Sequence, residues 1–155
     1  SEEEFQLQAS TDLGALLLDG LGDGVFLRAT NCGNEQMKMQ TAFGILQATR
    51  TRISKTEYIS CPSCGRTLFD LQETTAKIRS KTSHLKGLKI GIMGCIVNGP
   101  GEMADADYGY VGTGIGKITL YKEKEVVQRN IPSEDAVNAL IDLIKTNGDW
   151  VAPSS

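Results

Sequence analysis

The sequence predicts an α/β (α+β) fold in which a small mixed sheet with flanking helices occupies the larger, second part of the chain. Three observations support this prediction. Short strand-like segments bounded by turn residues recur after residue 56. A well-formed amphipathic helix pattern lies near the carboxyl end. The 155 residues are 40% hydrophobic, enough for one sizeable core, or for one domain plus a fragment of another. We expect a domain at residues 56–155, preceded at 1–55 by a piece of another domain.

The first segment has the pattern of a helix, a strand and a second helix. Leu13–Leu18 crowds apolar residues over two turns and is typical of a buried helix, and Val25–Ala29 has the pattern of a strand. After the turn at 31–34, apolar residues recur at helical spacing, namely Met39, Ala42, Phe43 and Leu46. Because no matching sheet accompanies this unit, we interpret 1–55 as the truncated end of a barrel-like α/β domain or insert domain.

The second segment begins with a short strand, Glu57–Ser60, followed by a cysteine loop. Asp70 and Glu73 have the spacing of a capping box, which predicts a helix that ends near His84. Leu88–Met93 then alternates as a half-buried strand. This strand delivers Cys95 at its carboxyl end, the end at which parallel sheets usually place their sites.

Two or three further strands are predicted before the last helix. They are Tyr108–Gly112, Lys117–Tyr121 and Glu125–Arg129, with a hairpin turn at Lys122–Lys124. The string Gly112–Lys117 superficially matches a phosphate-binding loop, but a strand pattern follows it instead of a helix. We therefore expect a β-turn there.

The last helix is predicted from about Ser133 to Thr146. Pro132 and Ser133 start it, and Gly148 stops it. Its apolar residues form one stripe, made of Ala136, Val137, Leu140, Ile141 and Ile144. This stripe is expected to face the sheet.

Composition excludes several classes of protein. The net charge is −3 and the pI is near 5.2, without a basic stripe, which argues against a nucleic-acid partner. No apolar run is long enough to span a membrane, and no leader pattern is present in the chain as given. The four cysteines are spaced asymmetrically, which favours a reduced, intracellular metal protein over a secreted disulfide framework.

Three cysteines carry the clearest chemical signal. Cys61 and Cys64 form a C-x2-C pair, and Cys95 follows the next predicted strand. Thiolates are soft ligands that hold zinc, cuprous copper or iron-sulfur clusters, so the pattern indicates a metal site that lacks a fourth cysteine. Cys32 stands in a turn-like stretch and is interpreted as a bystander thiol. His84 is the single histidine, which excludes a Cys2His2 zinc site.

The loop Asn98–Glu102 follows Cys95 closely. Its two glycines flank a proline, so the backbone is expected to turn sharply and approach whatever it faces. Free backbone N–H groups suit a thiolate-bound cluster, and Glu102 could offer it a carboxylate oxygen. Asn98 is either a contact or a turn former. The string Asp105–Asp107 is expected to form a polar turn near the mouth of the same site.

Two strings carry a resemblance to a known family. Residues 61–70 (CPSCGRTLFD) and 93–107 (MGCIVNGPGEMADAD) closely resemble the iron-sulfur domain of the hydroxymethylbutenyl diphosphate synthases. Residues 16–27 resemble the end of the barrel or barrel-like insert that precedes this domain, and the long, insert-containing form is the nearer relative.

The resemblance implies a set of ligands and a reaction. In that family three cysteines and a glutamate bind a 4Fe-4S cluster, which falls here on Cys61, Cys64, Cys95 and Glu102, with Glu102 also the catalytic residue. The implied reaction is the reductive opening of 2-C-methyl-D-erythritol 2,4-cyclodiphosphate to 4-hydroxy-3-methylbut-2-enyl diphosphate in isoprenoid biosynthesis. Implied too are a ferredoxin or flavodoxin as electron donor, a homodimeric full-length enzyme and a bacterial cytoplasmic location, or alternatively the plastid stroma. The barrel domain would bind most of the diphosphate, so this fragment is expected to be inactive alone.

Two other classes compete with this reading. A structural module could use the three cysteines and one more ligand to hold zinc, which the spacing alone permits. Against it stand the single C-x2-C pair and the Gly-Pro-Gly-Glu string, which a zinc knuckle does not need. A small ferredoxin-type electron-transfer protein would normally have four cysteines, so Glu102 argues against that class.

Overall fold

The structure is a computed structural model that describes residues 1–29, 31–61, 65–97 and 99–153, with the backbone alone at Pro100. Cys64 and Asn98, which the sequence singled out, lie outside the described residues. The chain divides into two compact units, Ser1–Ser54 and Lys55–Ser155. Among the helices described, none has the length and apolar character needed to cross a membrane.

The first unit consists of two helices, α1 (Glu2–Leu18) and α2 (Glu35–Ala48). Helix α1 begins earlier than expected because Ser1 and Glu4 form a capping box, in which the Ser1 hydroxyl accepts from the Glu4 amide at 3.2 Å. The strand expected at Val25–Ala29 was wrong, since these residues have no regular secondary structure. No other strand is described in this unit to pair with them, and an unpaired strand would leave its backbone groups unsatisfied.

The buried faces of the first unit also differ from expectation. Its small core contains Leu17, Ile45 and Leu46. Leu18 and Met39, which were expected on buried faces, are 71% and 60% exposed. Two helices alone offer too little surface to cover every apolar residue of such a segment. The assignment of this unit to the end of a barrel-like or insert domain stays a prediction.

The second unit is built on one five-stranded sheet, and it confirms the α/β class. The strands lie in the order in which they occur in the sequence: β1 (Glu57–Ser60), β2 (Lys89–Met93), β3 (Tyr108–Gly114), β4 (Lys117–Lys122) and β5 (Glu125–Pro132). The first three strands are parallel and the last two are joined to them as antiparallel hairpins. The expected turns at Gly112–Lys117 and Lys122–Lys124 are confirmed as the two hairpin connections.

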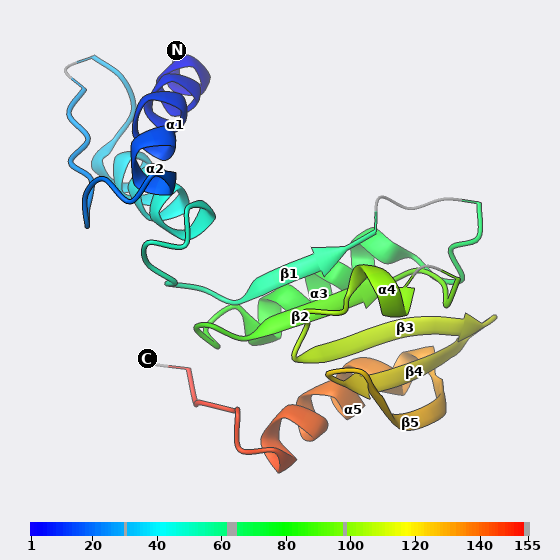
Figure 1. Ribbon diagram of the computed structural model, residues 1–155. Coiled ribbons are helices and arrows are strands. Elements are labelled where there is room, and N and C mark those ends of the chain that lie inside the picture. Colours follow the sequence, from blue (N-terminus) through cyan, green and yellow to red (C-terminus); the bar gives the residue numbers. More distant parts are fainter. Residues whose placement is uncertain (30, 62–64, 98, 154–155) are drawn as a thin grey trace. The chain divides into compact units, whose positions relative to one another are not determined.

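Helices α3 (Leu71–Thr82) and α5 (Ser133–Thr146) cover one face of this sheet (Figure 1). The core between them contains Ile78, Leu85, Ile90, Ile92, Tyr108, Tyr110, Leu120, Leu140 and Ile144, each at most 2% exposed. Burying a large apolar side chain contributes about 1.5–3 kcal/mol, so this layer dominates the stability of the unit. The Asp70 carboxylate caps α3 by accepting from the Glu73 amide at 2.8 Å, while the Glu73 carboxylate pairs with Lys77.

The segment after β2 crosses the opposite face of the sheet. It contains the short helix α4 (Gly99–Glu102), so the Gly-Pro-Gly-Glu string forms one helical turn. The next residue, Met103, is 2% exposed and packs over Gly91 and Gly109. A Cβ at Gly91 would lie 2.7 Å from the Met103 Cβ, so a side chain has no room there. The glycines of β2 and β3 thereby let the segment lie close to the sheet.

The expected place of Asp107 was wrong. Its carboxylate accepts from the Lys89 amide at 2.7 Å, and its own amide donates to the Lys89 carbonyl at 2.9 Å. Lys89 begins β2, whereas Cys95 follows the end of the same strand. Asp107 therefore fastens the start of β3 to the start of β2, at the end of the sheet away from the cysteines. Because β2 and β3 are parallel, the chain must run back along the sheet between them, and residues 94–107 make this long connection.

Candidate metal centre

Two of the predicted cysteines follow the carboxyl ends of neighbouring parallel strands. Cys61 comes directly after β1, and Cys95 comes two residues after β2. Ser60 is in register with Ile92, so both strands end at the same edge of the sheet. Both thiols are free and half-buried. The fold thus brings to one edge two residues that are distant in sequence, as strand polarity predicts.

Gly94 connects the two cysteine-bearing loops. Its amide donates to the Sγ of Cys61 at 3.3 Å, and its carbonyl accepts from the amide of Leu68 at 3.0 Å. A backbone N–H directed at sulfur favours the negative charge that the sulfur carries as a metal ligand. The sequence analysis did not identify Gly94, although the signal was present, since a glycine at the end of a buried strand often marks a close approach of two backbones.

Aromatic packing holds the stretch at residues 65–70, which leads to α3. Phe69 meets Tyr110 of β3 edge to face, with ring centroids 5.4 Å apart and planes at 77°. Burial raises the pKa of the Tyr110 hydroxyl to about 12, so this residue stays neutral and part of the core. The stretch before α3 is therefore anchored to β3, the strand next to the one that leads to Cys95.

Glu102 lies on α4 and is exposed. Within the ranges 1–29, 31–61, 65–97 and 99–153, which omit Cys64, no three His, Cys, Asp or Glu side chains gather closely enough to hold one metal ion. The structure thus brings Cys61 and the Cys95 loop together, and the ligand set of Cys61, Cys64, Cys95 and Glu102 stays a prediction. Two accessible thiols at one sheet edge, one of them receiving a backbone N–H, fit a soft metal centre.

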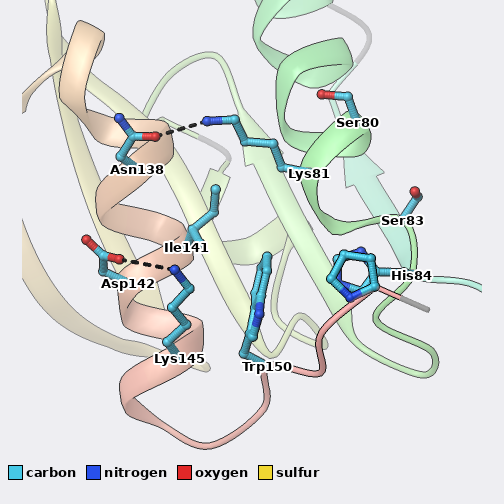
Figure 2. Close-up of a pocket in the computed structure, with 10 residues that line it drawn as sticks. Ser80, Lys81, Ser83, His84, Asn138, Ile141, Asp142, Lys145 and Trp150 are labelled. Carbon is cyan, nitrogen blue, oxygen red and sulfur yellow. Dashed lines mark hydrogen bonds and ion pairs between the residues drawn. The ribbon is translucent and has the colours of Figure 1, made fainter. Parts of the chain in front are cut away.

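His84 occupies another part of this unit. It comes two residues after the end of α3, a 12-residue helix of about 18 Å that starts beyond the cysteine loop. Its Nε2 lies 2.8 Å from the Val151 carbonyl, and its ring meets Trp150 edge to face. His84 and Trp150 line a cavity of about 710 Å³ between the α3 and α5 helices (Figure 2). His84 is thus engaged with the carboxyl-terminal segment.

Cys32 belongs to the first unit. Its Sγ lies 3.3 Å from the Ser1 carbonyl, to which it donates. This contact gives the thiol a local structural partner.

The sheet and its two helices define an α/β domain that carries two cysteines in the loops after neighbouring parallel strands. Residues 57–146 match the sequence profile of the family described as GcpE protein C-terminal domain, and the chain belongs to this family. The resemblance noted from the cysteine motifs is therefore confirmed.

Similar proteins from bacteria and a plant are all named as 4-hydroxy-3-methylbut-2-en-1-yl diphosphate synthases, and the names differ in the redox protein given in parentheses. The chain is 69% identical to the 4-hydroxy-3-methylbut-2-en-1-yl diphosphate synthase (flavodoxin) of Parabacteroides distasonis over 149 residues, which are 96% of this chain and 24% of that protein. It is 56% identical to the Leptospira interrogans protein of the same name over 153 residues, 99% of this chain and 23% of that protein. The rice protein, 4-hydroxy-3-methylbut-2-en-1-yl diphosphate synthase (ferredoxin), chloroplastic, is 60% identical over 153 residues, 99% of this chain and 20% of that protein. The chain spans about a quarter of the length of these relatives or less.

Proposed function

We propose that this chain is the cluster-bearing part of an iron-sulfur oxidoreductase that reductively opens 2-C-methyl-D-erythritol 2,4-cyclodiphosphate to 4-hydroxy-3-methylbut-2-enyl diphosphate. The observation that supports the proposal best is the hydrogen bond from the Gly94 amide to Cys61, which joins the two cysteine loops at one sheet edge. Family membership and the printed name of the relatives support the reaction.

In this proposal Cys61, Cys64, Cys95 and Glu102 hold a 4Fe-4S cluster, which when bound supplies electrons and a Lewis-acidic iron. The three cysteines anchor it through thiolates. Glu102 serves as the catalytic residue, because a carboxylate is a harder and more readily exchanged ligand than a thiolate. Its position on an exposed helical turn leaves it accessible to substrate.

The remaining parts of the reaction would come from outside this chain. The cyclic diphosphate needs cationic groups, and we assign most of them to the larger part of the full-length enzyme, so this chain alone should not turn over. A flavodoxin or ferredoxin would donate the electrons, as the names of the relatives suggest. We place the full-length protein, as a homodimer, in a bacterial cytoplasm, with the plastid stroma as the alternative.

Metal content tests the proposal directly. The chain and two variants, Glu102→Ala and Cys95→Ser, are reconstituted anaerobically with iron and sulfide, and iron and acid-labile sulfide are measured per chain. Wild type should hold about four of each. Cys95→Ser should lose the cluster, and Glu102→Ala should lose iron to a chelator faster than wild type. Cys32→Ser is the matched control and should retain the full content, because its thiol already has a local partner.

One tightly bound zinc per chain without sulfide, unchanged in Glu102→Ala, would contradict the proposal and identify a structural zinc module. A full cluster in both Cys95→Ser and Glu102→Ala would overturn the ligand set while leaving an iron-sulfur protein.

A further inference from the structure

We propose that Gly94 is the positioning residue of the metal centre, fixing the Cys61–Cys64 loop against the Cys95 loop. This inference rests on the ligand set proposed above. It adds a residue that contributes no side chain and acts through its backbone and through the space that its missing Cβ leaves free.

Both backbone groups of Gly94 are committed to the neighbouring loop. The amide donates to the Sγ of Cys61, at the start of that loop, and the carbonyl accepts from Leu68, near its end. A single residue next to Cys95 therefore holds both ends of the loop that contains Cys64. The distance between the two cysteine loops is consequently set by the contacts of this one residue, Gly94.

The third contact is steric. A Cβ at Gly94 would lie 2.8 Å from both Cγ2 and Oγ1 of Thr67, and 3.1 Å from its Cβ. Approaches below 3.0 Å force something to move, and all three atoms belong to a short side chain near its own backbone. Alanine at position 94 would push Thr67, and with it the adjoining Leu68, away from the Cys95 loop.

A second glycine, Gly112 of β3, lies against the Gly94 carbonyl. A Cβ at Gly112 of β3 would lie 2.5 Å from the Gly94 oxygen and 3.1 Å from Phe69 Cε1. Gly94 is thus enclosed between Thr67 on one side and β3 on the other, and it is buried. Gly94 and Gly112 are neighbours in space, and neither has room for a side chain. This lets the two cysteine loops and β3 approach one another closely.

Backbone strain is not the reason for glycine at position 94. Positive φ angles occur at other glycines, such as Gly87 and Gly116, and not at Gly94. Alanine can adopt the Gly94 backbone conformation, so the cost of the substitution comes from the contact with Thr67. Because backbone strain does not contribute, an alanine variant at position 94 tests the contact with Thr67 alone.

The experiment compares Gly94→Ala with Gly114→Ala in the full chain. Gly114 lies on β3, also lacks a positive φ, and a Cβ there would meet Lys117 at an ordinary 3.7 Å. After reconstitution, the rate of iron loss to a chelator should rise about 10- to 100-fold in Gly94→Ala, the range seen when groups that orient metal ligands are removed. Gly114→Ala should match wild type.

Hydrogen exchange in the metal-free chain provides a second readout that does not depend on iron. The amides of Gly94 and Leu68 should be protected in wild type, because both donate within the described contacts. The Leu68 amide should lose protection in Gly94→Ala. If both amides exchange in wild type as fast as exposed loop amides, the positioning role is overturned, even when Gly94→Ala cannot be folded.

The two proposals fail differently. If wild type takes up no iron and sulfide while the Gly94 and Leu68 amides are protected, the proposed function is wrong and the loop contact stands. If wild type holds the cluster and Gly94→Ala releases iron at the wild-type rate, the ligand set stands and Gly94 is not a positioning residue.

Discussion

The hydroxyl of Tyr108 donates a 2.6 Å hydrogen bond to the carboxylate of Asp149, joining the start of β3 to the segment after α5. Lys122 of β4 donates to the same carboxylate oxygen at 3.0 Å and to the Tyr108 oxygen at 3.1 Å. The Tyr108 side chain is otherwise fully buried. This triad fastens the carboxyl-terminal segment to the sheet at the end away from Cys61 and Cys95.

Tyr108→Phe should therefore destabilise the chain by about 1 kcal/mol, since it removes one hydrogen bond to a charged group that is partly exposed. The measurement is the free energy of unfolding in urea. Tyr110→Phe is a matched control, because that tyrosine lies two residues away on the same strand and is as deeply buried. Its hydroxyl has no hydrogen-bond partner among the residues that the structure describes. Equal losses in both variants would show that the Asp149 contact contributes nothing.

The same triad should make stability depend on acid. The Tyr108 hydrogen bond, aided by Lys122, lowers the pKa of Asp149 below its ordinary value of 3.8. A carboxyl whose pKa is depressed in the folded state contributes stability that is present above 3.8 and is lost as the pH falls through the folded value. Wild type should therefore exceed Asp149→Asn in stability at pH 6. The difference should shrink below about pH 4. Urea unfolding of both proteins across this range measures it, and a gap independent of pH would contradict the assignment.

The packing of Met103 over Gly91 and Gly109 leads to a prediction about stability. Gly91→Ala should destabilise by about 1–3 kcal/mol, because the new Cβ meets the Cβ of Met103, an atom that cannot rotate away. Gly109→Ala should cost less, since its closest contacts are the Sδ and Cε at the flexible end of Met103. Thermal and urea unfolding of both variants test the order. A larger loss in Gly109→Ala would show that the segment after α4 is not held as the contacts indicate.

The second unit was predictable where local patterns and tertiary packing agree. The helix Ser133–Thr146 was located to the residue, because an apolar stripe, a starting Pro132 and a stopping Gly148 all mark it. Gly148 indeed has a φ of +81°. The strand segments followed from short apolar runs between turns. The expectation that both cysteine loops leave strand ends is also confirmed.

The failures have a common physical cause, namely that the deciding contacts are distant in sequence. A segment such as Val25–Ala29 has the residues of a strand but no described partner strand in its unit. Asp107 was expected near the cysteines because it is close to them in sequence, whereas its backbone pairs with Lys89. Gly94 was not singled out because the contact that demands glycine comes from Thr67, on another loop.

The proposed role of Glu102 leads to a prediction in which retention and activity move in opposite directions. Glu102→Cys replaces a carboxylate with a thiolate, the softer and more firmly held ligand for iron. In a full-length enzyme with this substitution, iron loss to a chelator should slow, because all four ligands would be thiolates. Turnover should fall by at least about 10-fold, since a thiolate gives up its place less readily than a carboxylate. Glu102→Asp serves as the matched control, keeping the carboxylate while shortening its reach. Turnover equal to wild type in Glu102→Cys, with the cluster intact, would remove Glu102 from the catalytic set and leave it as a ligand that any donor can replace.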